Sequence, residues 1–156
     1  MLTIIGCGNL NRSDDGLGAI ISQRLQQFLI KHPDLSARAY DLGTAGMEVM
    51  FQAKGANELI IIDACSTNSE PGTIFQIPGE ELEELPQPSY TLHDFRWNHA
   101  LAAGRKIFAD DFPNKITVYL IEVANLDFGW SLSLPVQKAV DIVVRDLQQL
   151  CCTKYQ

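Results

Sequence analysis

The chain has 156 residues, which fit one domain over residues 1–156, because a single core of this size buries about two-thirds of the surface of the unfolded chain. Hydrophobic residues make up 46% of the sequence and charged residues 20%, which excludes an intrinsically disordered chain. The formal net charge of -7 argues against a nucleic-acid partner, because binding to phosphates requires clustered Lys and Arg side chains.

The first eight residues lead directly into a predicted strand and turn. They lack the basic leader, the apolar stretch and the small-residue cleavage site of a signal peptide. No run in the sequence approaches the ~20 apolar residues that a membrane-spanning helix needs. We therefore expect a cytoplasmic protein that has no membrane partner.

The first predicted unit is a strand, a glycine turn and an amphipathic helix. Residues 2–5 form the strand, and Gly6-Cys7-Gly8 closes it. Ser13 is placed to cap the helix, and Asp14 and Asp15 suit its first turn. Six residues at helical spacing trace the apolar face, namely Leu17, Ile20, Ile21, Leu25, Phe28 and Leu29.

The same alternation of strand and helix continues. A second strand is predicted over residues 37–41 and a short helix over residues 47–54. Residues 58–64 follow, and the continuous apolar run that they contain before Asp63 is typical of a central strand covered on both faces. This alternation indicates parallel strands joined by crossover helices.

The second half of the chain completes the pattern. Residues 73–77 form a strand expected at an edge of the sheet, and the acidic stretch 79–88 is either a solvated face or a short helix. A helix is predicted over residues 93–108, another buried strand over 115–123 and a closing helix over 135–150. The expected fold is α/β: a three-layer sandwich with a mostly parallel sheet of about five strands and helices on both faces.

Carboxylates follow the ends of the first three predicted strands. Asp15 comes shortly after the first strand, Asp41 ends the second and Asp63 ends the third. Ligands of open parallel sheets bind beyond the carboxyl ends of the strands, so these side chains are expected to share one rim.

A divalent metal fits this rim. Asp15 and Asp63 offer hard carboxylate oxygens from adjacent strand ends, and His93 offers an imidazole nitrogen at the start of a helix. Three protein ligands would leave coordination positions open for a substrate. The alternative is that the two aspartates cap helices and His93 forms a local hydrogen bond, and the residues alone do not separate these two interpretations.

A dinucleotide site is a further alternative, because a G-x-G turn follows the first strand. The third glycine of that fingerprint would fall at Asn11, and Asp14 and Asp15 would repel a pyrophosphate at the start of the helix. Asp41 is the one feature that partly fits ribose binding. A nucleotide-dependent oxidoreductase is therefore a weaker interpretation.

Four blocks of sequence occur in order over the first two-thirds of the chain. They are Gly6-Cys7-Gly8-Asn9-Leu10 with Asp14-Asp15-Gly16-Leu17-Gly18, then Asp41-Leu42-Gly43-Thr44-Ala45-Gly46-Met47-Glu48, then Ile60-Ile61-Ile62-Asp63-Ala64, and His93-Asp94. Together they make the sequence similar to the hydrogenase maturation endopeptidases, which process the large subunits of nickel-iron hydrogenases. The stretch from Gly129-Trp130-Ser131 to Pro135 also resembles the lead of that family into its last helix.

The resemblance implies an endopeptidase that removes the C-terminal extension of a nickel-loaded hydrogenase large-subunit precursor. It also implies that Asp15, Asp63 and His93 bind metal and that Asp41 lines the cleft, so these four residues make up the expected catalytic site. Nickel is then supplied by the precursor, and no permanent cofactor is expected. The hydrolytic step stays open between a metal-polarised carbonyl or water and a carboxylate general base, Asp41 or Asp63.

The partners implied by the resemblance are the large-subunit precursor and a hydrogenase assembly chaperone, and we expect a monomer. A noncatalytic metal-binding chaperone or sensor of hydrogenase assembly would use the same three ligands and is the alternative function. Arg96 and Trp97 follow His93 and are candidates for contact with the tail of the precursor. Alternatively, Trp97 packs in the core and Arg96 forms a surface ion pair.

Overall fold

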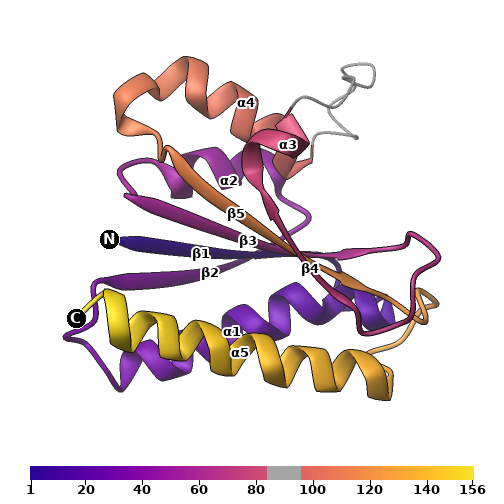
Figure 1. Cartoon of the computed structure of the whole chain (residues 1–156). Helices are drawn as coiled ribbons and strands as arrows, with labels where there is room; N and C mark the ends of the chain where they lie inside the picture. Colours follow the sequence, from indigo (N-terminus) through magenta and orange to yellow (C-terminus); the bar gives the residue numbers. More distant parts are fainter. Residues whose placement is uncertain (84–95) are drawn as a thin grey trace.

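The computed structural model describes residues 1–83 and 96–156 and contains a five-stranded sheet (Figure 1). The strands are β1 (Leu2–Cys7), β2 (Ala37–Gly43), β3 (Glu58–Cys65), β4 (Ile74–Pro78) and β5 (Lys115–Glu122). They lie in the order β2-β1-β3-β5-β4, and neighbours run parallel except for β4, which pairs antiparallel with β5 at one edge. The predicted mostly parallel sheet with an edge strand near residues 73–77 is confirmed.

Helices cover both faces of this sheet. They are η1 (Ser13–Gly16), α1 (Leu17–Ile30), α2 (Gly46–Ala53), α3 (Gly79–Glu83), α4 (Trp97–Phe108), η3 (Ala109–Asp111) and α5 (Leu134–Lys154). α1 and α5 pack together on one face, whereas α2 and α4 pack together on the other (Figure 1), which confirms the three-layer α/β sandwich. No helix within the described ranges combines the length and apolar character needed to cross a membrane.

β3 is buried on both faces of the sheet. Ile60 and Ile62 belong to the core that α1 and α5 share, whereas Leu59 and Ile61 belong to the core that α2 and α4 share. Successive side chains of a strand point to opposite faces, so a strand covered on both sides needs an unbroken apolar run. The run ends at Asp63, where the strand leaves the core.

Glycines allow β1 and α1 to touch. A Cβ atom on Gly6 would lie 2.0 Å from the carbonyl oxygen of Gly18, and one on Gly18 would lie 2.2 Å from the carbonyl oxygen of Cys7. Gly8 has a φ of 127°, and a Cβ atom there would lie 2.0 Å from the carbonyl oxygen of Asp15. The glycine turn therefore serves close backbone packing, which brings Asp15 to the end of β1.

The prediction that Ser13 caps the first helix is wrong. Ser13 has a φ of 49°, and its hydroxyl donates a hydrogen bond of 2.8 Å to the carbonyl oxygen of Asp127. A short 3-10 turn, η1, holds Asp14 and Asp15, and α1 begins only at Leu17. The local sequence favours a cap here, but a distant loop determines the backbone.

Other element ends also differ from the sequence pattern. β1 continues to Cys7 and α5 continues to Lys154, both further than predicted. The acidic stretch begins as the short helix α3, in line with one of its two interpretations. Residues 84–95 lie outside the described residues, and α4 begins at Trp97.

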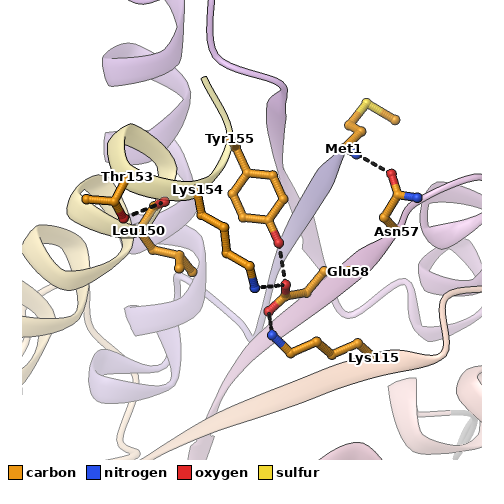
Figure 2. Close-up of polar contacts among 8 residues, drawn as sticks. All are labelled: Met1, Asn57, Glu58, Lys115, Leu150, Thr153, Lys154 and Tyr155. Carbon is orange, nitrogen blue, oxygen red and sulfur yellow. Dashed lines mark hydrogen bonds and ion pairs between the residues drawn. The ribbon is translucent and has the colours of Figure 1, made fainter.

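The buried carboxylate of Glu58, at the start of β3, forms hydrogen bonds with residues at the end of α5 (Figure 2). Glu58 is 5% exposed and accepts hydrogen bonds from Lys115 Nζ at 2.8 Å and Lys154 Nζ at 2.9 Å. The Tyr155 hydroxyl donates to the same carboxylate. Burial raises the pKa of Glu58, but these three donors outweigh it and lower the pKa from 4.5 to about 2. This contact explains why the last turn of α5 is ordered beyond its predicted end.

Candidate functional site

Asp63 lies at the carboxyl end of β3, where its carboxylate is oriented by two donors. The indole Nε1 of Trp97 donates to Oδ2 at 2.8 Å, and the backbone N–H of Ala64 donates to Oδ1 at 2.8 Å. Burial raises the pKa of Asp63, these two donors oppose the rise, and the negative charge of Asp15 adds to it. The net result is a raised pKa, which makes Asp63 a stronger base than an ordinary aspartate.

Asp14 and Asp15 are adjacent in sequence but have different surroundings. Asp14 is fully buried and accepts four hydrogen bonds, from Ala124 N, Asn125 N, Ser133 N and Ser133 Oγ. Asp15 is partly exposed and accepts one hydrogen bond of 2.9 Å from the backbone N–H of Asn9. Asp14 is thus a structural anchor, whereas Asp15 keeps lone pairs for a ligand.

Two hollows open at the carboxyl end of the sheet, with volumes of about 440 Å³ and about 220 Å³. The residues that line both of them are Asp15, Asp63, Arg96 and Trp97. The larger hollow is also lined by residues that follow β3 and β5, including Thr67 and Leu126. The smaller hollow is also lined by residues that follow β1 and β2, including Gly8 and Thr44. Asp15 of η1 and Asp63 of β3 therefore meet at the wall that the two hollows share.

Asp41 has a more peripheral position than these two carboxylates. Its Oδ2 accepts a hydrogen bond of 3.0 Å from Gln23 Nε2, and its Oδ1 accepts one of 3.1 Å from the backbone N–H of Gly43. Asp41 lines neither hollow. It lies at the end of β2, as the sequence indicates, but the structure does not bring it to the shared wall of the hollows.

His93, the expected third metal ligand, lies outside the described residues. Among residues 1–83 and 96–156, no three side chains of His, Cys, Asp or Glu are grouped so that they could hold a metal ion. Asp15 and Asp63 are thus the two expected ligands that the structure brings together.

The two cysteines near the site are poorly suited to nucleophilic attack. Burial, with the charges of Asp63 and Asp41, raises the pKa of Cys7. Burial and the carboxylate of Glu122 raise the pKa of Cys65 to about 12. Both side chains therefore remain protonated thiols at neutral pH.

Sequence reasoning missed the bond between Trp97 and Asp63. Trp97 packs against the core that α2 and α4 share, as one of the two interpretations predicts, and it also lines both hollows with its indole bonded to Asp63. Arg96 is exposed, lines both hollows and acts to lower the pKa of Asp63. The available signal was the position of Trp97 one turn after His93, but periodicity does not reveal such a long-range contact.

Comparisons with known proteins agree on one family. A family model described as "Hydrogenase maturation protease" matches residues 21–149. The "Hydrogenase 2 maturation protease" of Escherichia coli (strain K12) is 33% identical over 141 residues, which cover 90% of this chain and 84% of that protein. The fold is similar to that of a hydrogenase maturating endopeptidase from E. coli, with a TM-score of 0.79 and 24% identity over 99% of this chain and 94% of the other. It is also similar to a [NiFe] hydrogenase maturation protease from Thermococcus kodakarensis, with a TM-score of 0.72 and 23% identity over 96% of this chain and 98% of the other.

Proposed function

This chain belongs to the hydrogenase maturation protease family, and on that basis we propose that it recognises nickel already held by its substrate before it cuts. The chain is an endopeptidase that acts on a hydrogenase large-subunit precursor. In the proposed reaction, cleavage releases the C-terminal extension of that precursor. Nickel arrives with the precursor and is contacted by Asp15, Asp63 and His93.

The observation that carries this proposal is the shared wall of the two hollows. Asp15 and Asp63 both line it, and the charge of Asp15 raises the pKa of Asp63. Two carboxylates that repel each other bind a cation favourably, because the cation relieves the repulsion. Asp15 accepts one hydrogen bond and Asp63 accepts two, so lone pairs remain for a metal ligand bond.

His93 would complete this donor set with a nitrogen ligand. Nickel accepts both imidazole nitrogen and carboxylate oxygen, so two aspartates and one histidine suit it. Three protein ligands leave positions for the groups that hold nickel in the precursor. A precursor without nickel would lack the attraction that positions its scissile bond, and this makes nickel a checkpoint for cleavage.

We assign the general base to Asp63 rather than to Asp41. Asp63 lines both hollows, so the oxygen that does not contact nickel can accept a proton from water at the scissile bond. Asp41 lines neither hollow, so it is not placed to reach a water molecule at a bond held there. Nickel held at the wall would polarise the scissile carbonyl as a Lewis acid.

The test is cleavage of a purified cognate precursor, with and without inserted nickel, followed by mass spectrometry of the C-terminal tail. We expect cleavage only of the nickel-loaded form, and a loss of about 10²- to 10⁴-fold in rate for Asp63→Asn, the range usual for a general base. His93→Ala is expected to abolish cleavage of the nickel-loaded form. Asp141→Asn is the matched control, since Asp141 pairs with Arg24 in an exposed ion pair away from the hollows.

The outcomes separate the possible functions. Equal cleavage of both precursor forms would retain the protease and remove nickel recognition. A verified nickel-loaded precursor that binds but stays uncut would instead favour the noncatalytic metal-binding chaperone. Full activity of Asp63→Asn would overturn the assignment of the general base.

A further inference from the structure

Two aromatic side chains project from the loop between β5 and α5, residues 123–133, which we call the rim loop. Phe128 is 90% exposed and Trp130 is 83% exposed, more than any other large hydrophobic side chain among the described residues. Contact of an aromatic ring with water is unfavourable, and burying the ring against a partner removes that contact. A pair of exposed rings on one short loop therefore indicates a contact surface.

The rim loop is firmly held, so this exposure is built into the fold. Gly129 N donates to Asn11 O at 2.9 Å, and Ser13 N donates to Gly129 O at 2.8 Å. The indole Nε1 of Trp130 donates to Asn11 Oδ1 at 3.0 Å. The buried carboxylate of Asp14 accepts hydrogen bonds from both ends of the loop. These bonds leave the rings preorganised on the outside, which lowers the entropic cost of binding a partner.

The rim loop is also continuous with the active site. Leu126, near the start of the loop, lines the larger hollow together with Asp15 and Asp63. The side chain of Arg12 fixes this part of the loop by donating to Leu126 O at 3.2 Å. Phe128 and Trp130 therefore lie on a loop that begins in the wall of the hollow and continues onto the outer surface.

We propose that Phe128 and Trp130 dock against an apolar patch on the folded body of the large-subunit precursor, outside the segment that enters the hollows. The identity of this partner rests on the proposed function. Hollows of about 440 Å³ and about 220 Å³ hold only a short stretch of peptide, yet the enzyme must select one protein. Aromatic anchors beside the hollows supply that selectivity, since Trp, Tyr and Arg are enriched among the residues that dominate binding energy.

The first experiment measures cleavage rate against the concentration of nickel-loaded precursor for the wild type and for Phe128→Ser. We expect about a tenfold higher half-saturating precursor concentration for Phe128→Ser, with the maximal rate within about twofold of the wild type. Ile30→Ser is the matched control, because Ile30 is 78% exposed at the far end of α1 and should leave both constants unchanged. Unchanged half-saturation in Phe128→Ser would overturn the proposal.

A second experiment separates docking from cleavage. Binding of the precursor to Asp63→Asn and to the double variant Asp63→Asn/Phe128→Ser is measured by calorimetry, with nickel-loaded and nickel-free precursor. Weaker binding of both precursor forms to the double variant supports docking through the rim loop, even if the nickel checkpoint fails. If Phe128→Ser instead changes only the molecular mass of the enzyme in light scattering, the rings join copies of this chain and the proposal is wrong.

Discussion

The two ends of β3 carry carboxylates with opposite surroundings. At the amino end, Glu58 is paired with Lys115, Lys154 and the Tyr155 hydroxyl, and its pKa is lowered to about 2. At the carboxyl end, Asp63 faces two hollows, and burial and the charge of Asp15 raise its pKa. One strand thus carries an ion-paired carboxylate at its amino end and, at its carboxyl end, a carboxylate that accepts hydrogen bonds from neutral donors.

This difference shows how a small sheet divides stability from chemistry. A carboxylate with three positioned donors favours the folded chain and has little capacity left for a ligand. A carboxylate beside a like charge destabilises the folded chain at neutral pH but gains from a cation or a proton. Substitutions at the two ends should therefore separate stability from activity.

The largest effect on stability is expected for Glu58→Gln. The folded pKa of about 2, against an ordinary 4.5, corresponds to about 3 kcal/mol at neutral pH. Because the pKa is lowered on folding, this contribution is complete above about pH 4.5 and is lost as the pH falls toward about 2. Thermal unfolding at pH 7 should show a Tm lower by roughly 6–12 °C. The rate of cleavage at 25 °C should stay unchanged. A loss of activity in the folded variant would contradict the idea that Glu58 serves stability and not catalysis.

Trp97→Phe tests how the indole positions Asp63. The variant removes the donor at 2.8 Å, so the pKa of Asp63 should rise further, and the acid limb of the pH–rate profile should move to higher pH. We expect about a tenfold loss of rate at neutral pH, the order of one hydrogen bond to a charged group. The control is Asp141→Asn, which removes an exposed ion pair with Arg24 away from the hollows. An equal shift of the acid limb in both variants would show that Trp97 does not act through Asp63.

Asp63→Asn should lose activity and remove the cost that the charged carboxylate places on stability. Because the pKa of Asp63 is raised on folding, its charged form costs stability above the folded pKa, and this cost disappears as the pH falls below the unfolded value. The amide oxygen keeps only one of the two hydrogen bonds, from Trp97 or Ala64, so the stability of the variant relative to the wild type should be higher at pH 7 than near pH 3. Chemical denaturation at the two pH values measures the difference, and a relative stability that is no higher at pH 7 than near pH 3 would contradict the raised pKa.

Asp41→Asn should have the smallest effect. Asp41 lines neither hollow, and its hydrogen bonds link it to Gln23 and Gly43. We expect a change in rate of less than about threefold, since a neighbouring charge acts only weakly through solvent. Kinetics with nickel-loaded precursor provide the measurement, and a loss as large as that of Asp63→Asn would move the general base to Asp41.

The sequence predicts the layers and the meeting of Asp15 with Asp63, because both follow from regular patterns. Periodicity places the strands, and parallel strands bring their carboxyl ends to one rim. The different surroundings of Asp14 and Asp15 could not be predicted, since Asp14 is satisfied by residues more than a hundred positions away. The bond from Trp97 to Asp63 depends on tertiary packing in the same way. The failed cap at Ser13 has a related cause, because pairing with the rim loop sets its φ.

The neighbouring residues Asn57 and Glu58 hold the two ends of the chain. The amino group of Met1 contacts Asn57, and the Tyr155 hydroxyl contacts Glu58 (Figure 2). Both ends thus lie at the opposite end of the sheet from the hollows (Figure 1). An affinity tag or a surface linker at either end would leave the hollows and rim loop facing solution. A short peptide could also join the two ends, which makes the chain a good candidate for circular permutation with its site intact.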